Sequence, residues 1–139
     1  FAVDDDRGVC PVGWHVSSDE EWTTLITHLD ENAIPDTVGI QSLIAGGKMK
    51  EAGLDHWNYY SDDITEEATN ESGFKALPGG NYSIDGFRGL GYIAYFWSST
   101  DDSNYDVQAS RWLLYSLLES LDQDNSIKSS YYSVRCIKD

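Results

Sequence analysis

Two cysteines at opposite ends of the chain constrain its fold more than any other feature. Cys10 and Cys136 are the only cysteines among 139 residues. A disulfide between them would close a loop over almost the whole domain, and in the chain-entropy model such a loop raises the free energy of the unfolded state by about 5 kcal/mol. The bond would tie an early strand to the last one and would indicate an oxidising compartment, the cell envelope or the exterior. The alternative is two free thiols in a cytosolic protein.

The composition is that of a folded, strongly acidic chain. There are 24 Asp and Glu residues against 9 Lys and Arg, a formal net charge of −15, while 40% of residues are hydrophobic and 13% aromatic. The length predicts one domain over residues 1–139. The charge argues against nucleic acid and against anionic lipid as partners, and no apolar run approaches the roughly 18 residues of a membrane span. Because no initiator Met or signal peptide is present, we expect an excised domain or a mature chain.

The N-terminal third carries helical patterns. Ser18 and Glu21 fit a capping box at the start of a helix over about residues 19–31. Its apolar positions recur at helical spacing, at Trp22, Leu25, Ile26 and Leu29. A second short helix is expected at about residues 40–51, although Gly46 and Gly47 weaken it.

Patterns typical of strands and ordered loops follow residue 52. Residues 81–84 and 87–90 flank Asp85 and Gly86, a two-residue hairpin signal. Further strands are predicted at residues 92–100 and 131–138. The leucine spacing within residues 109–121 also suits a helix, but we favour a strand there. Helices followed by antiparallel strands predict an α+β domain.

Five blocks of the chain resemble the Fibrobacter succinogenes major paralogous domain family. They occur in the same order as in the family and cover nearly the whole chain, at residues 10–22, 45–51, 68–80, 97–100 and 133–139. The family is mostly found on surface-exposed or secreted proteins of gut-type bacteria. Membership would imply that Cys10 and Cys136 have a structural role.

The family in turn is similar to the formylglycine-generating enzyme superfamily, through residues 18–22 and 134–136. That likeness implies a C-type-lectin-like fold, with one or two N-terminal helices packed on short antiparallel sheets and with long ordered loops. The family usually has an aromatic strand before the point that corresponds to Phe1, so an upstream portion is expected. We expect Trp14, Trp22 and Trp97 in the core. Asn70 and Glu71 belong to a family block, and we expect them to bond backbone and organise the long central loop.

Aromatic residues interleaved with Ser, Asn and Asp are the most informative functional feature. Tyr and Trp supply rigid contact area with a polar handle, and Ser and Asn supply adaptable hydrogen bonds, a mix that is typical of binding loops. In proteins of this fold that bind variable ligands, the variable segment lies in the late strands and their loops. Partly on that analogy, the predicted ligand-facing set is Asp101, Asp102, Asn104, Tyr105, Asp106, Arg111, Trp112 and Tyr115.

Signals for metals, cofactors and catalysis are weak. Residues 102–106 alternate oxygen ligands as an EF-hand does, but Val107 and Leu113 stand where the hand needs Gly and Glu, and residues 122–126 fail the same test. A structural calcium of another type at these residues is an alternative to solvated acidic loops. We expect no other cofactor and no catalytic residue, since the reactive cysteine pair of formylglycine-generating enzymes is absent and no hydrolase elbow or phosphate-binding loop occurs.

The leading hypothesis is therefore a non-catalytic, cell-surface or secreted module for binding or adhesion. Its partner would be a glycan or a surface protein, and the charge favours a neutral or basic one. One alternative is a structural or terminal module of a surface assembly such as a pilus. Another is a carbohydrate-active enzyme, although the abundance of carboxylates makes that pattern uninformative.

Overall fold

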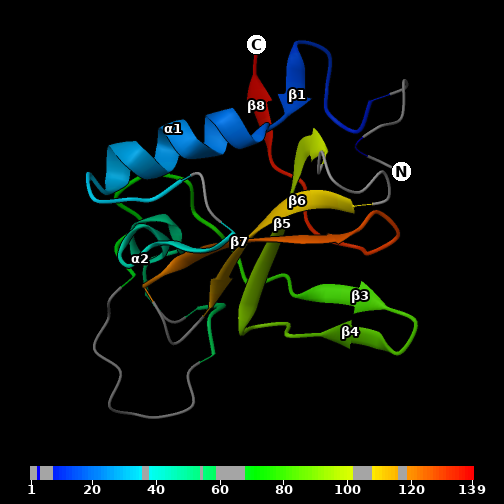
Figure 1. The fold of residues 1–139 in the computed structure, drawn as a ribbon. Helices are drawn as coiled ribbons and strands as arrows, with labels where there is room; N and C mark the ends of the chain where they lie inside the picture. Colours follow the sequence, from blue (N-terminus) through cyan, green and yellow to red (C-terminus); the bar gives the residue numbers. More distant parts are fainter. Residues whose placement is uncertain are drawn as a thin grey trace.

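The fold is α+β, with both helices in the N-terminal half (Figure 1). A computed structural model describes residues 3, 8–35, 38–53, 55–58, 68–101, 108–115 and 119–139, and the side chains of residues 108–113 lie outside that description. The elements are β1 (Trp14–Val16), α1 (Asp19–Leu29), β2 (Gly39–Ser42), α2 (Ala45–Met49), β3 (Asn81–Ser83), β4 (Gly86–Arg88), β5 (Ile93–Asp101), β6 (Gln108–Tyr115), β7 (Leu121–Ile127) and β8 (Cys136–Lys138).

These strands form three small antiparallel sheets. β1 pairs with β8, β3 pairs with β4, and four strands form a central sheet in the order β2-β7-β6-β5. The predicted α+β class with small antiparallel sheets is confirmed, but β1 precedes the first helix and β2 lies between the two.

Helix α1 begins where the sequence predicts. The Ser18 side chain accepts from the Glu21 backbone, and the Glu21 carboxylate accepts from the Ser18 backbone, so both halves of the capping box are present. Trp22, Ile26 and Leu29 form its buried face.

The second helix is shorter than expected, because β2 occupies the first part of the predicted range. The two glycines that weaken a helix have a packing role here. A Cβ at Gly46 would overlap with the Ser120 carbonyl, and the Gly47 N–H donates to the Glu119 carbonyl at 3.0 Å. The close contact between α2 and the residues just before β7 therefore offsets the low helix propensity of glycine.

Two strands of the central sheet lie in segments whose secondary structure the sequence left ambiguous. Residues 109–115 form most of β6, as favoured, whereas residues 116–118 lie outside the described residues. Residues 122–126 lie within β7, so their interpretation as a loop is wrong. All five residues are polar, and pairing with β2 and β6 on either side makes them a strand. The last predicted strand is also shorter, since only Cys136–Lys138 form β8.

The β3–β4 hairpin exists, but its turn is displaced by one residue. Ser83 pairs with Gly86, so the two turn residues are Ile84 and Asp85. Gly86 has a φ of 98°, which glycine adopts without the steric cost that other residues have. In Figure 1 the hairpin lies away from α1.

The core lies between α1, α2 and the central sheet. Trp22 and Trp97 are buried, but Trp14 is 45% exposed, and the expectation that it packs in the core is wrong. It lies on the short β1, which pairs only with β8 among the described strands. Trp57, which no periodic pattern identified, is instead buried, and its indole Nε1 donates to the Ala76 carbonyl at 3.1 Å.

The two chain ends are joined covalently and by a β-ladder. Cys10 and Cys136 form a disulfide with a Cα–Cα distance of 5.7 Å across a sequence separation of 126. Beside it, Val16 pairs with Cys136 and Trp14 with Lys138. The disulfide indicates an oxidising, extracytoplasmic location. Among the described residues, no helix has the length and apolar character needed to cross a bilayer.

An ionic cluster also joins β1, α1 and the last residue. The His15 Nδ1 lies 2.6 Å from the Asp139 carboxylate and its Nε2 lies 2.8 Å from that of Glu21. Because both ring nitrogens face carboxylate acceptors, the doubly protonated imidazolium satisfies both contacts. The hydrogen bonds with Asp139 and then Glu21 raise the pKa of His15 above its ordinary value of 6.5.

Removing the disulfide should lower stability strongly. We expect a Cys10→Ser, Cys136→Ser double variant to lose about 5 kcal/mol of unfolding free energy, because the long loop is then unrestrained in the unfolded chain. Urea denaturation measures the change, and reduction of the native chain should reproduce it. An unchanged midpoint for both would show that the bond contributes nothing to stability.

The contribution of His15 to stability should depend on pH. A raised folded-state pKa means that this contribution is complete below pH 6.5 and is lost as the pH rises through the folded-state value. The difference in unfolding free energy between the native chain and His15→Gln should therefore be larger at about pH 6 than at about pH 9. His28→Gln is the matched control. Equal differences at the two pH values would contradict the assignment.

Candidate functional site

Most of the predicted ligand-facing set cannot be placed. Asp102, Asn104, Tyr105 and Asp106 lie outside the described residues. Arg111 and Trp112 belong to β6, where the structure describes the backbone only. Their roles remain predictions.

The two members whose side chains are described lie far from each other. Asp101 ends β5 and pairs with Ala109, whereas Tyr115 ends β6 and pairs with Ile93. Along β6 the two positions are six residue steps apart (115 − 109), about 20 Å at the usual rise. Asp101 forms an ion pair of 2.6 Å with Lys128, and the Tyr115 carbonyl accepts from Lys50. Asp101 and Tyr115 therefore do not form one compact site.

The candidate calcium ligands fall into two groups. Residues 102–106 lie outside the described residues, and residues 122–126 belong to β7. In the part of the chain that the structure describes, no three His, Cys, Asp or Glu side chains cluster as metal ligands would.

The central loop is organised by the family block around residue 70. Asn70 has a φ of 52°, and its side-chain oxygen accepts from the Lys75 N–H at 2.8 Å. The Glu71 side chain makes a different contact from the one expected, an ion pair of 3.7 Å with Lys48 rather than a bond to backbone. Since Glu71 is mostly exposed, that pair contributes little to stability.

Three exposed rings form a cluster that we call the aromatic platform: Tyr82, Phe87 and Tyr131. Their exposed fractions are 43%, 72% and 65%, high values for such large apolar groups. Tyr82 faces Phe87 across the β3–β4 ladder, with ring centroids 5.0 Å apart, and faces Tyr131 at 5.6 Å. The Tyr82 N–H donates to the Tyr131 carbonyl, so backbone pairing sets the positions of all three rings.

The platform is supported by two half-buried rings, Tyr95 and Tyr132, and by the buried Trp97. Tyr132 stacks on Tyr95 with centroids 5.0 Å apart and packs against Trp97 at 4.7 Å. Its hydroxyl bonds with that of Ser126 at 2.8 Å. The chain that carries Tyr131 is thereby fixed to the central sheet, and the platform is held in place before any ligand binds.

A hollow of about 470 Å³ lies at the platform. Polar groups of Asn81, Ser133 and the backbone of Gly79 and Gly80 line it together with the rings. Aromatic faces with a few polar groups beside them are typical of sites that bind neutral organic surfaces such as sugar rings.

The three rings of the platform are not among the ligand-facing residues that the sequence predicted. The predicted turn at Asp85 and Gly86 would place Phe87 opposite Ile84, so only the observed register, with its turn one residue earlier, brings Tyr82 opposite Phe87. Nothing in the sequence placed Tyr131 beside that hairpin, since 48 intervening residues separate Tyr82 from it, counted as 131 − 82 − 1.

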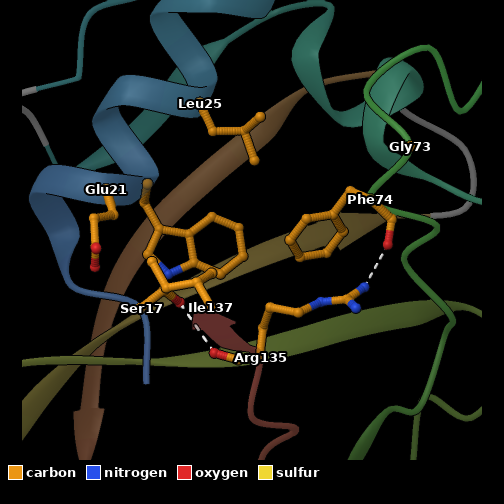
Figure 2. A pocket seen from close by; sticks show the side chains of 8 residues that line it. Ser17, Glu21, Leu25, Gly73, Phe74, Arg135 and Ile137 are labelled. Carbon is orange, nitrogen blue, oxygen red and sulfur yellow. Dashed lines mark hydrogen bonds between the residues drawn. The ribbon is translucent and has the colours of Figure 1, made fainter. Parts of the chain in front are cut away.

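A second hollow, of about 310 Å³, lies beside α1 (Figure 2). Its lining residues are Ser17, Glu21, Trp22, Leu25, Gly73, Phe74, Arg135 and Ile137. The Arg135 guanidinium lies 4.1 Å from the centroid of the Phe74 ring and donates to the Phe74 carbonyl. Burial lowers the pKa of Arg135 from its ordinary value, since the charged form is partly desolvated.

The Glu21 carboxylate at this second hollow already has hydrogen-bond partners. The Glu21 carboxylate accepts from the Ser18 N–H at 2.9 Å, from the Ser18 hydroxyl at 2.8 Å and from His15. Partial burial opposes its charged form, but the hydrogen bonds from Ser18 and His15 outweigh that effect and lower the pKa of Glu21.

Comparison with curated proteins and with solved structures finds no match. Comparison with protein families nevertheless gives a match that includes all five sequence blocks described above. The Fibrobacter succinogenes major domain matches residues 1–138, and the chain belongs to that family.

Proposed function

We propose that this domain is a non-catalytic binding module that recognises a glycan through the aromatic platform. The observation that carries the proposal is the exposure of Tyr82, Phe87 and Tyr131 in one preformed cluster. Ring faces held in place lose little conformational entropy when a ligand binds, and this favours binding of a flat apolar surface such as a pyranose face.

Charge narrows the class of glycan. The chain carries a net charge of −15, which repels polyanions at long range. At the hairpin itself Arg88 and Asp85 form an ion pair of 2.8 Å and cancel each other. A neutral oligosaccharide meets neither repulsion nor an unpaired charge at the platform, and we infer that it is the preferred ligand.

We infer that the domain has a C-type-lectin-like fold and that it is displayed at the cell surface or secreted. Two features support that assignment: the chain ends are paired in the β1–β8 ladder, and they are linked by the Cys10–Cys136 disulfide. The same disulfide supports a role without catalysis of the formylglycine-generating type, because neither thiol remains available as a reactive cysteine.

Removal of platform rings should weaken glycan binding without affecting the fold. Phe87→Ala and Tyr131→Ala should each reduce affinity for a neutral oligosaccharide by about tenfold, because each ring contributes stacking and buried area. A neutral-glycan array identifies the ligand, and calorimetric titration measures the change. Titration with and without EDTA tests whether calcium takes part.

Leu43→Ala is the matched control, since Leu43 is 70% exposed and lies outside the platform. It should bind as the native chain does. An array without any bound glycan, obtained with a folded and oxidised protein, would refute glycan recognition. Retention of a surface protein that depends on the platform rings would instead identify a protein partner.

An exposed aliphatic surface favours a second function, as a structural module of a surface assembly. It lies at β2, an edge strand of the central sheet, and consists of Ile34, Val38, Ile40, Leu43 and Ile44. Apolar edge strands are sites at which another chain can pair.

Cross-linking at the native cell surface tests this second function. Cross-links from β2 to a neighbouring subunit, lost in an Ile40→Lys variant, would support it. Cross-links that persist in the variant would contradict it.

A further inference from the structure

The hollow beside α1 is distinct from the aromatic platform, since the two share no lining residue. Figure 2 shows Phe74 at one side of this hollow, with Leu25 above it and Arg135 below, and Trp22 also lines it. The walls are therefore mostly apolar, with one cationic side chain at the edge. A volume of about 310 Å³ fits a ligand of roughly a dozen non-hydrogen atoms, at the small end of known ligand pockets.

The Arg135 guanidinium retains N–H donors that can bind an anion. A guanidinium carries five N–H donors in a planar fork. Among the described residues, the hydrogen bond of this side chain goes to the Phe74 carbonyl, and no carboxylate forms an ion pair with it. This is unusual in a chain with 24 acidic residues and 9 basic ones. A partly desolvated guanidinium gains most from an acceptor that carries negative charge and two oxygens.

The neighbouring titratable groups do not satisfy that demand. Glu21 lines the hollow, but its oxygens accept from Ser18 and His15. Asp139 bonds with His15 on the outer side of the same cluster. Arg135 is therefore the cationic group of a hollow whose other charged group, Glu21, already accepts hydrogen bonds, whereas the field of the whole chain is negative.

We propose that this hollow binds a small monocarboxylate with an apolar body. The carboxylate would pair with the open edge of the Arg135 guanidinium, and the apolar body would pack against Trp22, Leu25 and Ile137. The long-range negative field excludes polyanions, so a single charge next to an aromatic or branched aliphatic group is the chemistry that the hollow selects.

Titration with three small probes tests the proposal directly. The probes are 3-phenylpropionate, its neutral analogue 3-phenylpropan-1-ol, and inorganic phosphate, added to the oxidised native chain and followed by NMR. We expect saturable shifts of the Arg135, Phe74 and Trp22 signals with 3-phenylpropionate, and binding at least about tenfold weaker for the alcohol, because the charge-assisted hydrogen bonds are lost. Phosphate should not displace the carboxylate, since it cannot fill the apolar walls.

Two variants separate recognition from folding. Leu25→Trp should fill the hollow and abolish binding while Arg135 keeps its bond to Phe74. Arg135→Lys should keep the charge but lose at least about fivefold in affinity, because lysine lacks the planar fork. Val12→Ala is the control, since Val12 is fully exposed and does not line the hollow, and it should bind as the native chain does. Equal binding of acid and alcohol, no binding of either to the folded chain, or binding that survives Leu25→Trp would each overturn the proposal.

Discussion

The closure of the chain on itself is the constraint on which the rest of the structure depends. Three interactions act at the same place: the Cys10–Cys136 bond, the β1–β8 ladder and the His15 cluster. The covalent bond restricts the unfolded chain, whereas the ladder and the ion pairs act on the folded one. Together they fix the start of α1, because Glu21 belongs both to the capping box and to the His15 cluster. That helix in turn supplies Trp22 to the core and to one hollow.

Both proposed sites form where a segment near the C-terminus packs against an earlier part of the chain. The platform is carried by a hairpin and by the chain around Tyr131, which Tyr132 fixes to the central sheet through Tyr95 and Trp97. The hollow beside α1 is formed where the segment leading into β8 returns to the helix, so that Arg135 reaches Phe74. In each case a side chain near the C-terminus meets an element from earlier in the chain. Pairing of the chain ends therefore positions the residues of both proposed sites as well as the elements that carry them.

The sequence predicted those parts of the fold that depend on local interactions. Capping, helical periodicity and turn residues act over a few positions, and they correctly indicated α1, the β3–β4 hairpin and most of β5. Predictions failed where distant contacts override local preference. Gly46 is tolerated in α2 because it packs against Ser120, and Trp14 is exposed on a strand that pairs only with β8 in the described part of the chain. Residues 122–126 resemble a loop in composition, yet pairing with β6 and β2 makes them a strand.

By itself, the sequence determined the α+β class, the family and the strongly acidic composition. It favoured a bond between Cys10 and Cys136, which the structure then showed. Only the tertiary structure decided which aromatic residues are exposed together. An exposed ring and a buried ring have the same local sequence pattern, since burial depends on what packs over the strand and not on the strand itself. Tyr131 joins Tyr82 and Phe87 at the surface, while Tyr132, the next residue, is fixed on the sheet. The alternation of side chains along an extended backbone separates the two, and long-range pairing determines which of them faces solvent.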